Sequence, residues 1–218
     1  MRLTLQTHFD GEWHYAATLE LKDGAAGFLG ASIADYDLDY FVSVASAEFA
    51  AGKTVRDHRA LSVRYPVDLE NRYSRSWPPF LLDLRPQGPA RRKLAGHLGL
   101  AEGARASDLP LLLRSATGGI GNIRIREAAD AEAERLRGVE RQGVTEAEIL
   151  DRSDRFMEAA DRFGMLASGS SGLQGEWPKV AMTQANDGLY YPDSVVTDDE
   201  AVRHVIVNGV LVASHGVH

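Results

Sequence analysis

Apolar and polar residues alternate along the first positions of the chain, which is the period of a β-strand with one buried face. Leu3 and Leu5 lie on one side of that strand, and polar residues separate them. An Asp-Gly pair at positions 10 and 11 is typical of a hairpin turn. The pattern therefore predicts a hairpin whose second strand runs from Trp13 to Leu21.

A second alternating stretch follows a glycine-rich connection. Its even positions from Tyr36 to Val42 are apolar or aromatic, and its odd positions from Asp35 to Asp39 are acidic. This parity predicts a strand with an acidic face. Three alternating Asp residues could bind a cation, but no Gly or Glu follows at the spacing of a calcium loop. We favour a solvent-exposed face that discourages pairing at a sheet edge.

The next stretch mixes a strand with helices. Alternation from Leu61 to Tyr65 predicts a strand that Pro66 ends or confines to an edge. After two prolines, the segment 80–82 (Phe-Leu-Leu) is expected to be buried. Pro89 suits the first position of a helix over 90–98, and Ser107-Asp108 suits the cap of another. A glycine cluster then leads to a strand expected over 120–125.

The composition changes at about Glu127. Residues 127–141 are charged and Ala-rich, which is typical of a solvated helix or a linker. Thr145 and Glu148 have the spacing of a capping box before a second helix, which is expected to bury Ile149 and Phe156 on one face. Residues 186–188 (Asn-Asp-Gly) favour a hairpin, and a strand-like run follows at 205–207.

These elements predict an α+β fold. We expect a mixed or antiparallel sheet with two or three helices, followed by a helix and a small β-meander. Residues 1–126 would form the first domain, 127–144 a charged linker or helix, and 145–218 the second domain.

Composition narrows the class of protein. The chain has 218 residues, of which 44% are apolar and 25% charged, the profile of an ordinary globular protein. It contains no Cys, so it has neither disulfides nor a thiolate site, and this fits a reducing compartment. It lacks an apolar run of about 18 residues and a secretory signal. We therefore expect a cytoplasmic protein without a membrane partner.

The net charge of −7 argues against this chain as a main DNA-binding surface, because neutralising phosphates requires clustered Lys and Arg. One local basic patch is present, and its alternative interpretation is the solvated start of a helix. The patch consists of Arg85, Arg91, Arg92 and Lys93.

The stretch SGSSGLQGEWPK at 168–179 is where chemistry could occur. Glycines allow backbone N–H groups to approach phosphate oxygens, and hydroxyl and ammonium groups add donors. The candidate phosphate-binding residues are Gly169, Ser170, Ser171, Gly172, Gly175 and Lys179. The stretch has neither the Walker spacing nor the dinucleotide pattern. A flexible Gly/Ser loop is therefore the alternative interpretation.

Histidines supply no further candidate. His215 and His218 have the spacing of metal ligands on a helix, but no acidic or Cys residue accompanies them. The remaining histidines are isolated in sequence, so no catalytic constellation can be argued from spacing. We predict no metal ligand and no catalytic residue within the chain.

The motifs, taken in order, resemble the N-terminal region of HipA-family kinases, which are toxins of bacterial toxin–antitoxin systems. The LRPQG segment resembles especially the HipH branch of the family. The stretch from Ser170 to Lys179 resembles the family's glycine-rich loop, and the resemblance extends from about Glu12 to Val207. The other matching segments are 61–67, 79–88, 91–98, 111–113 and 118–121.

The resemblance implies an ATP-dependent Ser/Thr protein kinase that uses ATP and Mg²⁺. In such kinases the loop covers the nucleotide phosphates, and its serine is autophosphorylated to switch the enzyme off. Ser170 and Ser171 are the candidates for that serine. The family also implies a HipB-like helix-turn-helix antitoxin as partner, so any DNA contact would come through that partner.

The sequence departs from the family at one end. The strand at 203–207 resembles the one that delivers a phosphate-contacting lysine, but Asn208 stands at that position. A kinase also needs a catalytic Asp and metal ligands from its C-lobe, and only ten residues follow Asn208. We therefore expect no independent catalysis, as for a truncated product, a fragment or one chain of a split kinase.

Two other interpretations stay open. In some split systems the N-terminal subdomain is encoded separately and resembles an inhibitor of the kinase chain, so residues 1–125 would be an antitoxin-like binding module. The other interpretation is an unrelated soluble scaffold whose motifs match by accident.

Overall fold

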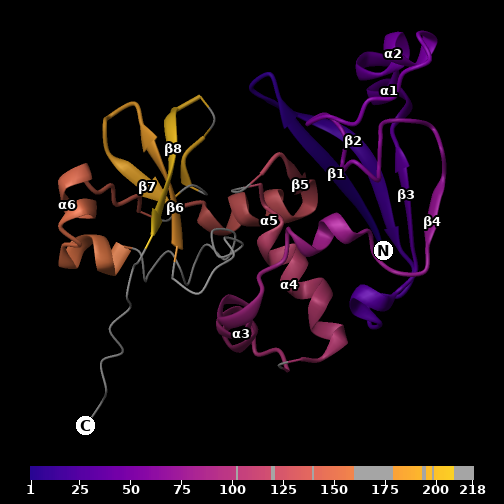
Figure 1. Ribbon diagram of the computed structural model, residues 1–218. Helices are drawn as coiled ribbons and strands as arrows, with labels where there is room; N and C mark the ends of the chain where they lie inside the picture. Colours follow the sequence, from indigo (N-terminus) through magenta and orange to yellow (C-terminus); the bar gives the residue numbers. More distant parts are fainter. Residues whose placement is uncertain are drawn as a thin grey trace.

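The computed structural model describes residues 1–101, 103–118, 121–138, 140–159, 179–192, 195–197 and 199–208. The fold is α+β and both of its sheets are antiparallel, as predicted (Figure 1). The larger sheet has the strand order β4-β3-β2-β1-β5. Its strands are β1 (Arg2–Phe9), β2 (Glu12–Leu21), β3 (Ser32–Tyr36), β4 (Arg72–Ser74) and β5 (Ile123–Ile125).

The hairpin predicted at the start of the chain is confirmed, because β1 and β2 pair along the whole of β1. The turn residues Asp10 and Gly11 have φ values of 51° and 81°. This left-handed backbone matches the twist of the two strands that the turn joins.

The strand predicted across 35–42 is wrong in its second half. β3 ends at Tyr36, and helix α1 (Leu38–Val44) begins two residues later. The cause is local, because the Asp37 carboxylate accepts hydrogen bonds from the backbone N–H groups of Asp39 and Tyr40. This cap starts a helix where the parity of the sequence favours a strand. A second short helix, α2 (Ser46–Ala50), follows it.

The strand predicted over 61–65 is also wrong. These residues form a turn that an isolated bridge between Ser62 and Tyr65 closes, and Val63 is 68% exposed at its tip. The buried Tyr36 hydroxyl accepts a hydrogen bond from the N–H of Leu61 and donates one to the carbonyl of Tyr65. Because one side chain holds both ends, the segment folds back instead of extending along a sheet.

The helices predicted over 90–98 and after Ser107-Asp108 are present as α3 (Gly88–His97) and α4 (Asp108–Ser115). The other helices of residues 1–138, besides α1 and α2, are η1 (Gly27–Leu29), η2 (Pro79–Leu82), η3 (Arg105–Ser107) and α5 (Arg126–Leu136). The expected burial of 80–82 holds for Phe80 and Leu81. The strand expected from position 120 is described only as β5, which is shorter.

The cap predicted for α4 is absent. The Ser107 side chain makes no capping bond, since its hydroxyl donates to the carbonyl of Ala101. Asp108 accepts a hydrogen bond from the N–H of Phe28, far away in the sequence. A nearby loop carbonyl therefore uses the Ser107 hydroxyl and a distant N–H group uses the Asp108 carboxylate, so neither side chain caps the helix.

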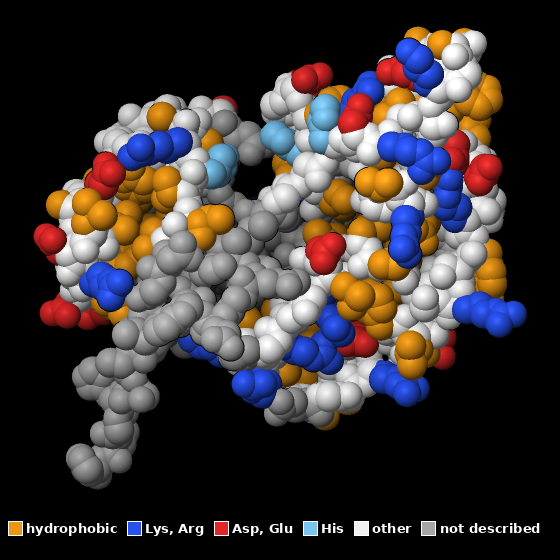
Figure 2. Space-filling view, in the orientation of Figure 1, with side chains coloured by type: hydrophobic (Ala, Val, Ile, Leu, Met, Phe, Trp, Pro, Cys, Tyr) orange, Lys and Arg blue, Asp and Glu red, His pale blue; other side chains and the backbone are white. Residues whose placement is uncertain are grey.

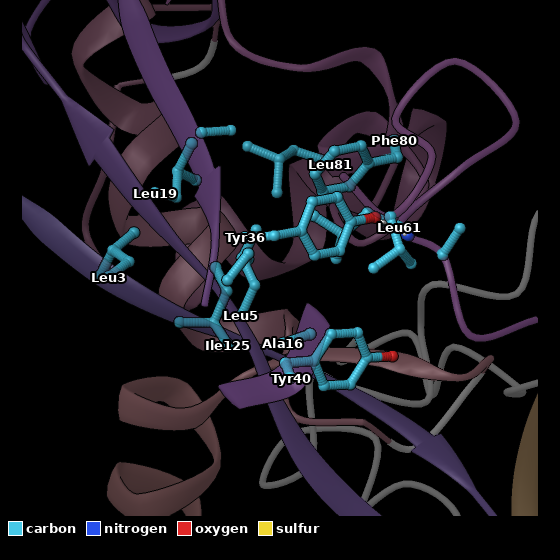
Figure 3. Close-up of a cluster of buried hydrophobic side chains, with 14 of the residues drawn as sticks. Leu3, Leu5, Ala16, Leu19, Tyr36, Tyr40, Leu61, Phe80, Leu81 and Ile125 are labelled. Atoms are coloured by element: carbon cyan, nitrogen blue, oxygen red, sulfur yellow. Dashed lines mark hydrogen bonds between the residues drawn. The ribbon is translucent and has the colours of Figure 1, made fainter. Parts of the chain in front are cut away.

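The core of the larger sheet brings together residues from both ends of this region. Leu3, Leu5 and Leu19 from β1 and β2 pack with Leu81 of η2 and with Ile125 of β5 (Figure 3). Burying such side chains contributes about 1.5–3 kcal/mol each. The core thus fixes the segment 60–84 against the sheet and holds β5 beside β1.

The segment expected to be a solvated helix or a linker contains helix α5, and this helix is not fully solvated. Ala128 and Glu132 are buried, and the Glu127 carboxylate accepts hydrogen bonds from the N–H of Thr4 on β1. α5 therefore packs against the larger sheet. We call β1–β5, α1–α5 and the 3₁₀ helices the five-stranded unit.

A smaller three-stranded sheet follows, and Figure 1 shows it on the other side of α5 from the larger sheet. We call the described residues 140–208 the three-stranded unit. They contain helix α6 (Glu146–Leu150) and strands β6 (Lys179–Ala185), β7 (Tyr190–Pro192) and β8 (Ala201–Asn208). The order is β7-β6-β8, so the predicted hairpin is confirmed and the predicted β-meander is wrong. β8 pairs with β6 and not with β7.

The helix predicted after Thr145 is interrupted. The capping box between Thr145 and Glu148 is confirmed, but α6 ends at Leu150. Arg152 then has a positive φ of 50°, and helical backbone resumes at 154–159. The break does not prevent Phe156 from being fully buried. None of the helices among the described residues is long and apolar enough to cross a membrane.

Candidate functional site

The candidate site lies at one end of the three-stranded sheet. The predicted residues Gly169, Ser170, Ser171, Gly172 and Gly175 lie outside the described residues, as do His215 and His218. The sixth candidate, Lys179, is the first residue of β6. The stretch singled out by its glycines therefore leads directly into the central strand of this sheet.

The register of the sheet places two positions of interest opposite each other. Lys179 pairs with Asn208, and Val180 pairs with Val207. Asn208 is the position at which the resemblance calls for a lysine. The beginning of β6 and the end of β8 therefore lie at the same end of the sheet. Residues that are distant in the sequence become direct neighbours there.

A small core holds these strands in place. Val144, Phe156, Met182 and Tyr190 are buried together. Val144 and Tyr190 also exchange two backbone hydrogen bonds, of 2.9 and 2.8 Å between N and O. The segment before α6 is thereby tied to β7, and this fixes the position of α6 beside the sheet.

The charged contacts of this sheet gather at its opposite end. The Arg141 guanidinium binds the Glu200 carboxylate through two hydrogen bonds of 3.1 and 2.9 Å. This contact lowers the pKa of Glu200 to about 2. The Tyr191 hydroxyl donates a 2.6 Å hydrogen bond to Asp187, which lowers the pKa of that carboxyl and raises the pKa of Tyr191.

The contacts of Arg141 with Glu200 and of Tyr191 with Asp187 stabilise the β6–β7 hairpin. Asp187 lies in the β6–β7 turn, and Glu200 directly precedes β8. Arg141 also lies over the Tyr191 ring, with 5.0 Å between the guanidinium carbon and the ring centroid. The ion pair therefore clamps the turn end of the sheet, opposite the end at which Lys179 pairs with Asn208.

The four residues of the predicted basic patch lie in two different environments. Arg85 and Arg91 both bind the buried Asp108 carboxylate, Arg91 at 2.9 Å. Burial lowers the pKa of the Arg85 guanidinium. Arg92 and Lys93 are exposed on α3. Lys and Arg side chains are scattered over the face shown in Figure 2 and form no continuous stripe there, which gives phosphate backbones no extended surface.

Sequence reasoning missed the acidic partner of this patch and a second buried carboxylate. Glu132 of α5 is bound by Arg114 at 2.7 Å and by Arg135. No motif marks Glu132, and the sequence marked Asp108 only as part of a helix cap. Buried acidic residues are rare unless they are paired. The only signal in the sequence is therefore an Asp or Glu at a helix position whose neighbours at i±3 and i±4 belong to the buried face.

The three alternating Asp residues do not form a cation site. Asp37 caps α1, and Asp35 lies on β3 while Asp39 lies in the first turn of α1. Among the residues that the structure describes, no cluster of three or more His, Asp or Glu side chains could hold a metal ion.

No protein-family model matches the chain. A search of curated proteins found no match either.

Proposed function

We propose that this chain is the N-terminal part of a HipA-like Ser/Thr protein kinase of a bacterial toxin–antitoxin system. In this proposal the five-stranded unit corresponds to the family's N-terminal subdomain. The three-stranded unit corresponds to part of a kinase N-lobe. Ser170 or Ser171 in the glycine-rich stretch would be the autophosphorylated residue, and ATP with Mg²⁺ would be the ligand.

The observation that carries the proposal is the register of β6 and β8. A kinase N-lobe brings a glycine-rich loop and a strand position for a phosphate-contacting cation to the same end of one sheet. Here the glycine-rich stretch leads into Lys179, and Lys179 pairs with Asn208. Asn208 is uncharged, so in this proposal Lys179 supplies the cation at this end of the sheet.

In this proposal the 218 residues bind a nucleotide but do not transfer its phosphate. The catalytic Asp and the metal ligands would come from a C-lobe supplied by a further segment or a second chain. A HipB-like antitoxin would be the DNA-binding partner, and the complex would reside in the cytoplasm.

A second candidate function is a non-enzymatic inhibitory module of a split kinase of this type. One observation favours it: among the described residues, the core of the five-stranded unit is built from positions 3–128. Such a unit can bury its own apolar face without the three-stranded unit. It would then act by binding a kinase chain.

Thermal unfolding with and without Mg-ATP tests the first proposal. A ligand that binds only the folded state at a hundredfold excess over its Kd stabilises by about 2.7 kcal/mol. We expect an upward shift that Lys179→Ala reduces. Lys53→Ala, a change of the same kind in the five-stranded unit, should leave the shift intact. An unchanged transition would contradict a nucleotide site in this chain and favour the binding module.

A further inference from the structure

An open groove on the five-stranded unit lies between the turn at 62–65 and the segment that begins with η2. Its volume is about 550 Å³, within the range of ~300–1,000 Å³ of ligand-binding pockets. Val63, Tyr65, Phe80 and Leu82 line it with apolar surface. Two motifs singled out in the sequence, LSVRYPV and PFLLDLRPQG, thus face each other across one groove.

The wall formed by the turn is held rigidly. The Tyr36 hydroxyl binds both ends of the turn, at 2.8 Å from the N of Leu61 and 2.6 Å from the O of Tyr65. Figure 3 shows this hydroxyl directed at Leu61. Burial raises the pKa of Tyr36, so its hydroxyl stays neutral and can both donate and accept.

Further contacts fix the tip and the floor of the groove. An Arg56 guanidinium nitrogen donates a 2.6 Å hydrogen bond to the carbonyl of Val63. The Tyr65 ring packs edge-on against Phe80, with 5.3 Å between the ring centroids. Val63 is therefore presented to solvent by a turn that is already ordered. Preorganisation of this kind lowers the entropic cost of binding.

Two opposite charges line the same groove. Arg64 and Asp83 are exposed, and neither has an ion pair or a side-chain hydrogen bond with the described residues. Other charges of this unit do form ion pairs, as Arg72 does with Asp68 and Arg59 with Asp57. The groove thus combines apolar surface with one unpaired cation and one unpaired anion.

We propose that this groove binds an extended peptide segment of a partner protein. An apolar side chain of the segment packs against Val63, Tyr65 and Phe80. An acidic side chain on one flank meets Arg64, and a basic side chain on the other flank meets Asp83. The apolar anchor supplies affinity, and the two charges set the direction of the segment. This inference does not depend on the kinase proposal, because it uses only the five-stranded unit.

Fluorescence anisotropy on the full chain tests the proposal with synthetic peptides. Each peptide has a central leucine, and the two flanks carry Glu, Lys or Ser in every combination. We expect one order of Glu and Lys to bind about fivefold tighter than the reverse order, the effect of exposed ion pairs. The double variant Arg64→Glu with Asp83→Lys should invert this order. Val63→Ser should weaken every peptide and keep the order.

The matched control is Lys53→Glu with Glu140→Lys, which makes the same charge changes at exposed positions outside the groove and should leave the preference unchanged. The proposal is overturned if no peptide binds, or if the preferred order survives the charge swap. It is also overturned if sedimentation shows self-association that Arg64→Glu abolishes, because the groove would then bind a second copy of the chain.

Discussion

The two units of this protein are held together by different interactions. The five-stranded unit has a large core, a buried pair of tyrosine hydroxyls and two buried carboxylates that each bind two arginines. The described part of the three-stranded unit buries a handful of side chains around Phe156. Its ion pairs among the described residues lie at or near the surface: Arg141 with Glu200, Arg155 with Glu148 and Arg203 with Glu146.

The difference indicates that the two units differ in stability, and that the two proposed binding sites lie in units of different stability. Exposed ion pairs contribute ~0–1 kcal/mol each, so the described contacts of the three-stranded unit rest mainly on its small core. Elements with few buried contacts open first in a native protein. We therefore expect the candidate nucleotide site to lie in the less stable unit, and the peptide groove in the more stable one.

The largest expected loss of stability results from Phe156→Ala. Removing a fully buried Phe costs ~3–5 kcal/mol, and Phe156 is fully buried in the small core. We expect amide hydrogen exchange in β6–β8 to accelerate strongly while β1–β3 keep their protection. Mass spectrometry of peptides from each strand measures both.

Leu150→Ala is the control for this variant, because Leu150 lies in the same unit and is 75% exposed. It should change exchange very little. If Phe156→Ala accelerated exchange in β1–β3 as much as in β6–β8, the two units would unfold together and the comparison would fail.

Asp108→Ala should have the next largest effect, and in the other unit. Breaking a buried ion pair costs ~3–5 kcal/mol, and we expect about 2–4 kcal/mol here because the two arginine partners keep some exposure. The Arg85 and Arg91 side chains are 15% and 18% exposed. Chemical unfolding monitored through Trp77, which is buried in the larger core, measures the loss.

The control for Asp108 is Glu134→Ala, which removes an exposed ion pair with Arg137 on α5. Its effect should be close to zero. Equal losses from the two variants would mean that Asp108 contributes as a surface charge, and the contrast between buried and exposed pairs would not hold.

Local signals explain what could be predicted from the sequence. The Asp-Gly turn at 10–11 and the Asn-Asp-Gly turn at 186–188 each lie between alternating strands, so both hairpins were predictable. The capping box at Thr145 was predictable for the same reason. Each of these signals acts within a few residues.

Predictions failed where a distant or competing contact decides the backbone. The turn at 61–65 exists because Tyr36, 25 positions from Leu61, anchors it. Likewise, Asp108 meets arginines 23 and 17 positions away. At Asp37 two local signals competed, and the helix cap prevailed over strand parity. The resemblance suggested the Lys179–Asn208 edge, but only the register of β6 and β8 shows that these positions are neighbours.

The smallest expected effect is on the stability of the three-stranded unit at acidic pH. Glu200 has a pKa of about 2 in the folded protein, against an ordinary value of 4.5. A lowered folded pKa means that the carboxylate stabilises the fold above pH 4.5 and that this contribution is lost as the pH falls towards 2. The hydrogen bonds from Arg141 are the first cause, so Glu200→Gln should remove most of this pH dependence.

Urea unfolding followed by the NMR signals of β6–β8 amides between pH 5 and about 2 measures this effect. Asp57 provides the internal comparison, because its hydrogen bonds with Arg59 lower its pKa to about 2 in the five-stranded unit. Acid should therefore weaken both units in the wild-type chain, and Glu200→Gln should change the acid response of the three-stranded unit alone. Glu140→Gln, at an exposed position nearby, should change neither. A variant Glu200→Gln that altered the acid response of β1–β3 would show that the Arg141–Glu200 pair stabilises the whole molecule and not one end of the small sheet.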